Sequence, residues 1–374
     1  MSAVTLGASA ARFNPDAVDR LSRHVQGLID SGALLGAQFA LAADGQIGAS
    51  ASFGSATDEH RFVIFSATKP IVSAAIVALM ASGAIDITRP VAHYLPEFAS
   101  NGKHDVTVEQ VMLMQGGFPQ ALIGLDQFVS SAGRREAFAA WALDWPAGTR
   151  CEYHPVTAHW VLAEIIETIT GMPYATAIHE MVTAPAGITK VLGPEMADHA
   201  AVVEIRMRGE WPSHEALLSV YGTPECIPEM SIGADALLIM NLAMARAAGV
   251  PGGGGVARAT DIAALYQSWL ADPQLRDAMT NIRNNLTNET SKYPAHRTLL
   301  FEIAGDDDDQ WRRWFPAHQP RTFGHHGAGG QICWADPDTG VSFCFLHDTL
   351  EQDVTCEVLR VREINELAAA CVGR

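Results

Sequence analysis

The sequence predicts a mixed α/β (α+β) fold in which an antiparallel sheet, built from both termini, is flanked by helices and carries an inserted all-helical domain. Two patterns predict it: short β-prone runs gather near the two ends of the chain, and apolar residues at helical spacing fill the middle. The chain has 374 residues, of which 48% are hydrophobic and 18% charged, so it is long enough to bury a sizeable core. We therefore expect a globular protein of about two domains.

The N-terminal region shows signals for a helix followed by a hairpin. Asn14 and Pro15 form a cap and first-turn signal. They precede an apolar stripe at helical spacing, formed by Val18, Leu21, Val25 and Leu28. Two short β-prone runs then flank Asp44-Gly45, a dipeptide that favours a two-residue hairpin turn. We expect a helix and then two paired strands.

The C-terminal region shows the same elements in the opposite order, two strands followed by a helix. Strands are expected at about residues 330 to 335 and 341 to 347, joined by a Pro-Asp-Thr-Gly turn. Asp353 is a favoured N-cap residue for the helix that follows. The apolar stripe of that helix consists of Val354, Val358, Val361, Ile364, Leu367 and Cys371. Both ends of the chain therefore supply strands and a covering helix.

The segment between these ends shows mostly helical patterns, such as "AHWVLAEIIETITG", which Gly171 and Pro173 close. We expect a discontinuous sheet domain made of residues 1–85 and 251–374, and a helical domain made of residues 86–250. The active site is then expected in the cleft between the two.

Charge and apolar patterning narrow the classes of partner. The net charge of -17 and the pI near 5.2 argue against a nucleic acid or an anionic membrane, because neutralising phosphates requires a basic face. The opening residues lack a basic start and a sustained apolar stretch, so no secretory signal is expected. The longest apolar run, residues 71–81, is shorter than the roughly 20 residues that a membrane span needs.

The cysteines favour a reducing compartment. None of them forms a C-x-x-C pair, a pattern typical of structural thiols in a cytoplasm. They are scattered along the chain at Cys151, Cys226, Cys333, Cys344, Cys356 and Cys371. We expect a cytoplasmic protein.

The stretch "FVIFSATKPIVSAAIVALM", residues 62–80, carries a serine and a lysine at the mouth of an apolar run. If a helix starts at Ser66, Lys69 lies one turn further on the same face, and Pro70 is tolerated in that first turn. A serine hydroxyl is a poor nucleophile unless a base takes its proton, and burial can lower a lysine pKa from about 10.4 enough for that task. The pattern predicts an activated serine, although S-x-x-K fixes only two residues.

Competing motifs are weak. Ser100 and Lys103 also match S-x-x-K, but they follow Pro96 in a polar stretch where we expect both side chains to be solvated, so this match is interpreted as chance. There is no G-x-S-x-G and no H-E-x-x-H. The adjacent His325 and His326 would point to opposite sides of a strand. We expect no metal and no cofactor.

Four stretches belong together: the segment from Phe65 to Phe98, "GGFP" at residues 116–119, Tyr153, and the strand motif His325-His326-Gly327. Together they resemble the class C β-lactamase and family VIII carboxylesterase group of serine hydrolases, which is β-lactamase-related and similar to penicillin-binding proteins. The likeness runs over nearly the whole chain. It implies a β-lactamase/transpeptidase-like fold and a reaction through a covalent acyl-enzyme.

The resemblance also assigns roles. It implies that Ser66 is the acylated nucleophile, Lys69 its immediate partner and Tyr153 the second member of the proton-transfer pair. The oxyanion hole would consist of the backbone N–H groups of Ser66 and Ala328, and Gly327 would keep the strand edge open for substrate. The sequence leaves open whether Lys69 or Tyr153 is the general base.

Two departures from the family pattern bear on the substrate. The family's tyrosine motif usually ends in an asparagine that contacts an amide group, and here Pro155 stands in its place. The lysine of the strand motif is His325, a weaker and pH-dependent partner for a substrate carboxylate. Both changes favour carboxylic esters as substrates.

The expected function is therefore a serine hydrolase that cleaves esters through an acyl-enzyme on Ser66 and needs no cofactor. Alternatives on the same site are an amidase or D-amino-acid peptidase acting on a small amide, a weak β-lactamase, and an acyltransferase. A non-catalytic scaffold is disfavoured because Ser66, Lys69 and Tyr153 are all present. The motifs do not bear on the oligomeric state.

Overall fold

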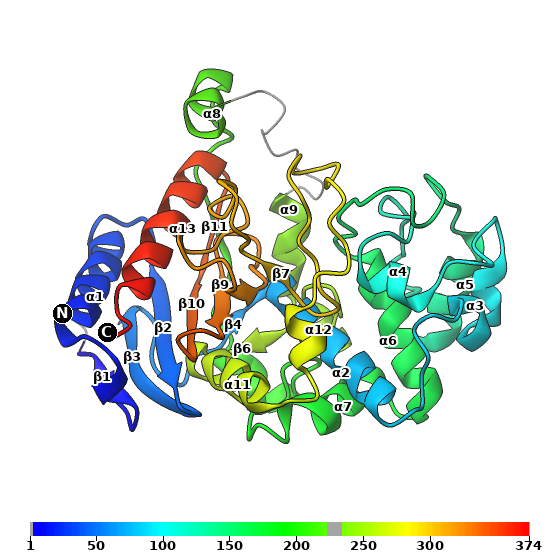
Figure 1. Ribbon diagram of the computed structural model, residues 1–374, viewed down its shortest axis with the longest axis horizontal. Helices are drawn as coiled ribbons and strands as arrows, with labels where there is room; N and C mark the ends of the chain where they lie inside the picture. The colour runs from blue at the N-terminus through cyan, green and yellow to red at the C-terminus, as the bar shows by residue number, and fades with distance from the viewer. Residues whose placement is uncertain (1–2, 223–233, 374) are drawn as a thin grey trace.

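The computed structural model describes residues 3–222 and 234–373. Its centre is a seven-stranded sheet in the order β1-β3-β2-β10-β9-β8-β7, with neighbouring strands antiparallel (Figure 1). The strands are β1 (Thr5–Leu6), β2 (Gly36–Ala43), β3 (Gln46–Gly54), β7 (Glu302–Ile303), β8 (Phe323–Gly324), β9 (Ile332–Asp336) and β10 (Val341–His347). Strands from both ends of the chain thus form one sheet, which confirms the predicted fold class.

The two halves of the sheet meet where β2 pairs with β10. This pairing runs from Ala37 opposite His347 to Ala43 opposite Val341. The β2–β3 hairpin turns at Asp44 and Gly45, whose φ angles are 54° and 75°. Positive φ at both central residues is the requirement of a type I′ turn, so the Asp-Gly signal predicted this hairpin for the right physical reason.

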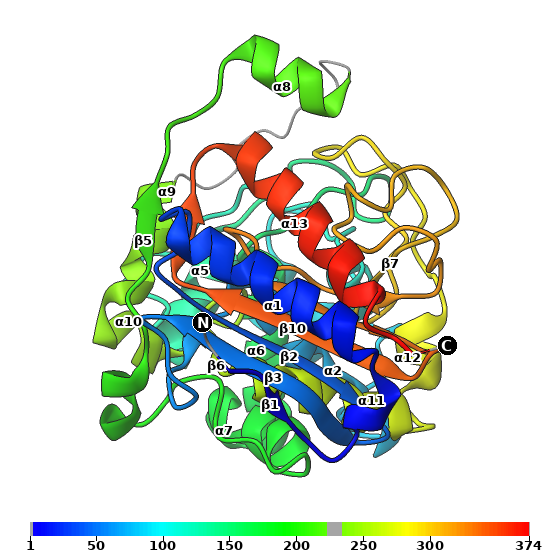
Figure 2. The ribbon, with the colours of Figure 1, turned by 90° about the vertical axis from the view of Figure 1, so that its left-hand side faces the viewer.

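Helices cover both faces of the sheet. Helices α1 (Pro15–Asp30) and α13 (Val354–Ala369) lie next to each other over one face, as Figure 2 shows, and α11 (Ala259–Ala271) packs against β2 and β10. The side chain of Asn14 caps α1 and that of Asp353 caps α13, each by accepting two backbone N–H groups. Both predicted caps are confirmed.

Strand β2 shows why the helices sit where they do. Phe39 and Leu41 belong to the apolar cluster that α1 and α13 cover, whereas Ala40 and Ala42 belong to the cluster that includes α11. Side chains alternate between the faces of a strand. The large residues therefore fill the space below α1 and α13, and the small residues let α11 approach the backbone.

Apart from the helices that cover the sheet, α8 (His214–Tyr221) lies near α13 at the top of Figure 1, and a second, mostly helical region lies on the right. Its centre is the pair α2 (Lys69–Ala81) and α6 (Thr157–Thr170), which pack against each other. Gly171 ends α6 with a φ of 68°, as its position in the sequence predicts. The further helices are α3 (Val91–Tyr94), α4 (Val108–Met112), α5 (Ser131–Ala140), α7 (Tyr174–Ile178), α9 (Ala234–Leu237), α10 (Ala243–Ala248) and α12 (Arg276–Thr280).

Two small sheets lie apart from the central sheet. Strand β5 (Arg206–Arg208) pairs in parallel with β11 (Thr349–Glu351), and β4 (Phe62–Val63) pairs with β6 (Val256–Ala257). Strand β5 lies within the segment expected to be all helical, so that segment is not purely helical. The division into domains at residues 85 and 250 stays a prediction.

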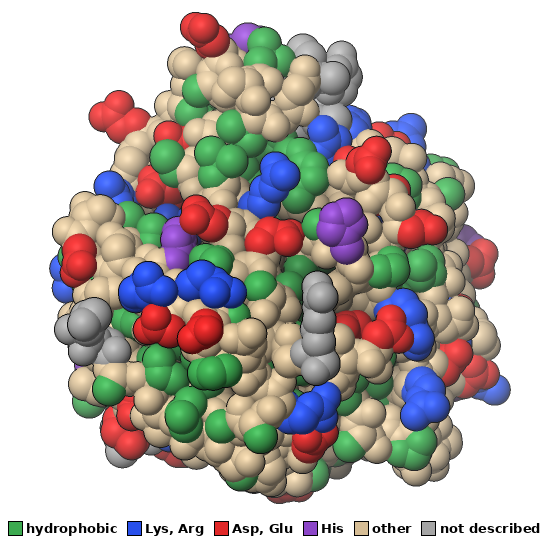
Figure 3. All heavy atoms as spheres, turned by 60° about the vertical axis from the view of Figure 1, so that its left-hand side comes forward, with side chains coloured by type: hydrophobic (Ala, Val, Ile, Leu, Met, Phe, Trp, Pro, Cys, Tyr) green, Lys and Arg blue, Asp and Glu red, His purple; other side chains and the backbone are tan. Residues whose placement is uncertain are grey.

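The helices, cysteines and surface charges bear on the expected location and partners of the protein. Among the described helices, none has the length and the apolar character that crossing a membrane requires. The described cysteines are free thiols, and Cys226 lies outside the described residues. On the face in Figure 3, acidic and basic side chains are interspersed. The acidic excess of the chain is therefore not gathered at one place on this face.

Candidate active site

Ser66 is presented by a short, strained turn. It lies in a 3₁₀ turn, Phe65–Thr68, and α2 begins only at Lys69. The helix therefore does not start at Ser66, as the sequence suggested: a 3₁₀ turn precedes α2, and Ser66 lies in that turn. Phe65 has a φ of 44°, a region that a bulky side chain enters only when its surroundings enforce it, and Phe65 is buried. Pro70 occupies the first turn of α2, as predicted.

Lys69 is a buried amine with three partners. Its Nζ lies 3.0 Å from Ser66 Oγ, 2.8 Å from the carbonyl oxygen of Pro155 and 2.6 Å from that of Gly252. A carbonyl oxygen only accepts, so two N–H bonds are committed and the third position of the nitrogen faces the serine. Burial holds the pKa of Lys69 well below its usual range, and the nearby positive charge of Arg297 lowers it further.

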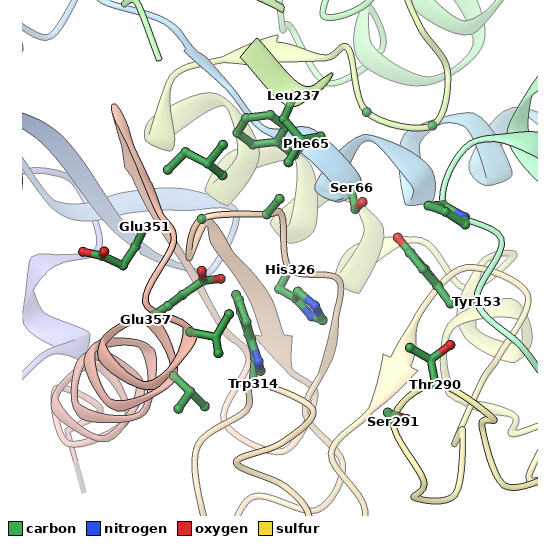
Figure 4. Close-up of a pocket in the computed structure, with 18 of the residues that line it drawn as sticks. Phe65, Ser66, Tyr153, Leu237, Thr290, Ser291, Trp314, His326, Glu351 and Glu357 are labelled. Atoms are coloured by element: carbon green, nitrogen blue, oxygen red, sulfur yellow. The ribbon is translucent and has the colours of Figure 1, made fainter. Parts of the chain in front are cut away.

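Tyr153 adjoins both residues. Its ring centroid lies 4.9 Å from Lys69 Nζ, and its hydroxyl shares a hydrogen bond with Ser66. Figure 4 shows the hydroxyl end of Tyr153 directed toward Ser66. Burial raises the pKa of Tyr153 above its usual value, and the hydrogen bond with Ser66 only partly offsets this effect. Tyr153 therefore keeps its proton near neutral pH.

A buried histidine fixes the segment that carries Tyr153. His154 Nδ1 lies 2.7 Å from the carbonyl oxygen of Glu152, and the backbone N–H of Phe118 donates to His154 Nε2 over 3.2 Å. Burial lowers the pKa of His154 to about 4, so the ring is neutral, with Nδ1 as its donor. Phe118 belongs to the Gly-Gly-Phe-Pro turn, which the structure thus brings against the tyrosine motif. The sequence gives no sign of this role for His154.

The turn after β8 faces Ser66 from the sheet side. Ala328 lines the cavity beside Ser66, and its backbone N–H has no acceptor among the described residues. Gly327 does not line the cavity: its N–H donates to Gln331, and a side chain there would come within 2.2 Å of the carbonyl oxygen of Ile64. The missing side chain of Gly327 therefore leaves room for the backbone of Ile64, and its expected role in keeping the strand edge open for substrate stays a prediction.

The two adjacent histidines differ in position. The ring of His325 is buried, 6.1 Å from the Tyr153 ring, and its Nδ1 lies 2.8 Å from the carbonyl oxygen of His326. His326, not His325, lines the cavity, where it stacks on Trp314 at 4.1 Å. Burial lowers the pKa of both rings, that of His326 to about 4. The structure places His326 rather than His325 on the cavity wall, and the expected contact between His325 and substrate stays a prediction. With both pKa values lowered, neither ring is charged at neutral pH.

The cavity beside Ser66 has a volume of about 380 Å³. Figure 4 places Ser66 and Tyr153 at one end, Glu351 and Glu357 at the other, and Trp314 between them. Burial raises the pKa of Glu357 to about 7. Apolar side chains form most of the remaining wall, among them Val156, Leu237, Met240, Val250, Leu350 and Val358. The cavity therefore suits a substrate with an apolar group next to its reacting carbonyl.

Sequence reasoning missed two further features of the site. The glycine run at residues 249–255 indicates only a flexible connection in the sequence, yet Gly252 supplies a carbonyl to Lys69. Arg297 and Glu302 form a buried ion pair whose guanidinium carbon lies 5.5 Å from the Tyr153 ring centroid. No motif marks this pair, and only a search for charges in an otherwise apolar stretch could have singled it out.

Within residues 3–222 and 234–373, no group of three or more His, Cys, Asp or Glu side chains is arranged to hold a metal ion.

Comparison with known proteins places this geometry in a family. A sequence model of the Beta-lactamase family matches residues 21–363. The chain belongs to this family. Among curated proteins, the Esterase/beta-lactamase LipL of Mycobacterium tuberculosis is 27% identical over 301 residues, which cover 77% of this chain and 69% of LipL.

Solved structures share the fold of this β-lactamase family member. A penicillin-binding protein homologue from Caulobacter crescentus superposes with a TM-score of 0.74 at 23% identity, over 98% of this chain and 99% of the homologue. A family VIII carboxylesterase superposes with a TM-score of 0.75 at 21% identity, over 95% and 98% of the two chains. The β-lactamase/transpeptidase-like fold is confirmed. The protein is a serine hydrolase of the β-lactamase fold.

Proposed function

We propose that this serine hydrolase cleaves carboxylic esters through a covalent acyl-enzyme on Ser66. One observation carries the proposal: Ser66 Oγ borders an apolar cavity and lies 3.0 Å from a buried amine, Lys69 Nζ, while sharing a hydrogen bond with Tyr153. A serine hydroxyl beside a desolvated base is the arrangement that nucleophilic catalysis requires. The names of LipL and of the family VIII carboxylesterase support esters as the substrate class.

Acylation begins with the proton of Ser66. Lys69 takes this proton, because its pKa is lowered whereas that of Tyr153 is raised, and Ser66 Oγ attacks the carbonyl carbon of the ester. The π electrons of the carbonyl move to its oxygen. The backbone N–H groups of Ser66 and Ala328 stabilise the resulting oxyanion.

Collapse of this intermediate releases the alcohol. The carbonyl reforms, the bond to the alcohol oxygen breaks, and that oxygen takes the proton of the Tyr153 hydroxyl. The Lys69 ammonium, which lies beside the Tyr153 ring, then gives its proton to the tyrosinate, so Lys69 is neutral again. Water then attacks the acyl group and gives a proton to Lys69. The bond to Ser66 Oγ breaks, and Ser66 recovers its proton as the acid leaves.

Esters suit the site better than lactams or peptides. A lactam needs its amide held and its nitrogen protonated, but Pro155 has no side-chain donor and its carbonyl already binds Lys69. The neutral His326 on the wall offers no charge to the carboxylate that β-lactams carry. One absent hydrogen bond to a polar group costs about 0.5 to 1.5 kcal/mol, and more when a buried partner is left unpaired.

The test compares leaving groups on the purified protein. We predict that kcat/KM for the best short-chain p-nitrophenyl ester, chosen from a panel of graded acyl length, exceeds that for nitrocefin by about two orders of magnitude or more. The Ser66→Ala variant is the control for uncatalysed hydrolysis. If nitrocefin or a D-alanyl dipeptide is turned over as well as the best ester, the protein is a lactamase or a peptidase and the proposal fails.

A further inference from the structure

A buried ion pair lies against the proton-transfer group. Arg297 and Glu302 are 3% and 8% exposed, and Arg297 Nη2 forms a short contact with Glu302 Oε1. The guanidinium carbon of Arg297 lies 5.5 Å from the ring centroid of Tyr153, and Lys69 Nζ lies 4.9 Å from the same centroid. The Arg297 guanidinium and the buried Lys69 amine therefore both contact one tyrosine ring, at the distances of cation–π interactions.

The backbone fixes Arg297 in this position. Residues 297 and 302 pair as an antiparallel bridge around a tight turn, in which the Thr298 hydroxyl accepts the N–H groups of Leu300 and Phe301. Arg297 also pairs with Asn284, whose side chain donates to the carbonyl of Leu113. The backbone of Arg297 is thus held by two neighbouring segments, and its guanidinium by Glu302, before any substrate binds.

Stability alone does not explain this pair. The desolvation of two charges usually offsets their attraction, so a buried ion pair contributes little net stability compared with apolar residues of the same size. In addition, Arg297 Nε is buried and finds no acceptor among the described residues, which is unfavourable. The contact with the Tyr153 ring indicates instead that the charge of Arg297 acts on the active site.

We propose that Arg297, held by Glu302, is the fixed cation of the active site and sets the pH range in which Ser66, Lys69 and Tyr153 work. The inference rests on the proposed function of these three residues and adds a positioning residue that acts on them by its charge. The strand motif supplies no such charge, because His325 stands where the resembled lactamases carry a lysine and is buried as a neutral ring.

The other ionisable groups around Tyr153 do not compete with Arg297 at neutral pH. Four buried histidines face the site, and desolvation lowers the pKa of each of them, so all are neutral. They are His154, His159, His325 and His326. Among the described residues, the charges that act on Tyr153 are those of Arg297 and Glu302, whereas Glu351 and Glu357 lie at the other end of the cavity. Arg297 lowers the pKa of both Lys69 and Tyr153, and Glu302 raises both.

Removing either charge shifts the pKa values of Lys69 and Tyr153, and with them the pH profile, in opposite directions. Without the positive charge of Arg297, Lys69 and Tyr153 hold their protons to higher pH, so both limbs of the pH profile move to higher pH. Without the negative charge of Glu302, both limbs move to lower pH. A unit charge at 5 to 6 Å, at the effective dielectric constant of protein sites and with the partner's opposing charge, shifts a pKa by about one unit.

The experiment measures kcat/KM for a short-chain p-nitrophenyl ester from pH 5 to 10 in four variants of the full chain. These are Arg297→Met, Arg297→Lys, Glu302→Gln and the double variant Arg297→Met/Glu302→Met. The double variant removes both charges, so it folds even where Arg297→Met alone would leave Glu302 buried without a partner. Circular dichroism checks each fold, and Ser66→Ala checks that Ser66 carries the activity.

We expect Arg297→Met to move the profile up by about one pH unit, Glu302→Gln to move it down, and Arg297→Lys to leave it near the parent position. The double variant moves up by a smaller amount, because Arg297 has the larger effect on Tyr153. A loss of activity that is equal at all pH values overturns the inference, as does a shift of the same sign in Arg297→Met and Glu302→Gln. If Ser66→Ala remains active, the proposed function itself fails; unshifted profiles with an inactive Ser66→Ala refute the role of Arg297 alone.

Discussion

The two S-x-x-K matches, Ser66–Lys69 and Ser100–Lys103, look alike at first sight. The lysine Nζ lies 3.0 Å from the serine Oγ in the first and 3.4 Å in the second. Both lysine side chains are buried. The expectation that Lys103 is solvated was therefore wrong, because the polar residues around it form a turn that packs against α5. Proximity of serine and lysine does not distinguish the two.

The hydrogen bonds of the two pairs distinguish Ser66–Lys69 from Ser100–Lys103. The Ser100 hydroxyl donates to the carbonyl of Ala139 over 2.6 Å, and Lys103 donates to the carbonyls of Ser100 and Trp141. Neither side chain lines the described cavity beside Ser66. Ser66, in contrast, borders that cavity and shares a hydrogen bond with Tyr153. A reactive serine thus needs a hydroxyl that is not committed to the backbone, a second proton carrier, and space for a substrate.

The largest expected effect separates the two serines. Ser66→Ala is predicted to abolish labelling by a fluorophosphonate probe and to lower kcat by about a thousandfold or more, because the nucleophile is lost. Ser100→Ala is the matched control and is expected to leave kcat/KM unchanged. Mass spectrometry of the labelled peptide identifies the modified serine. A label on Ser100, or activity that survives in Ser66→Ala, would reverse the comparison.

A smaller effect concerns the proton carriers that only the Ser66 site has. Lys69→Ala and Tyr153→Phe are each predicted to lower kcat by about a hundredfold or more, the lower range for loss of general acid or base catalysis. Because the two residues work as a unit, the double variant should be little worse than either single one. Steady-state kinetics on folded protein decide this. Losses that multiply in full would mean that Lys69 and Tyr153 act independently.

The smallest effect is on stability. Lys103→Met is predicted to lower the free energy of unfolding by about 1 to 3 kcal/mol, because two buried carbonyls lose their donor, while kcat/KM stays unchanged. Both lysines have a lowered pKa in the folded state. The unfolded chain then binds more protons, so stability gains with rising pH up to the usual lysine value.

This dependence gives a second measurement on the same pair. The difference in unfolding free energy between the parent and Lys69→Met is predicted to rise more from pH 7 to 9.5 than the difference for Lys103→Met, because the pKa of Lys69 is lowered further. Urea unfolding at several pH values measures both. Equal slopes would show that the two lysines are desolvated alike, and the comparison would then rest on Tyr153 and the cavity alone.

The sequence by itself determined the features that depend on neighbouring residues. The caps at Asn14 and Asp353, the turn at Asp44-Gly45 and the end of α6 at Gly171 each follow from the chemistry of a few adjacent positions, and each is found where it was expected. The fold class followed from the positions of these elements along the chain. The cytoplasmic location and the roles of the site residues stay predictions.

Only the tertiary structure decided which groups surround Ser66. The carbonyls that hold Lys69 belong to residues 86 and 183 positions away, and the cation beside Tyr153 comes from Arg297 in a turn without a motif. It also placed His326 rather than His325 on the cavity wall and committed the Ser100 hydroxyl to Ala139. Burial and contact between distant segments are properties of the packed chain, and they set the pKa values and the free hydroxyl on which the chemistry depends.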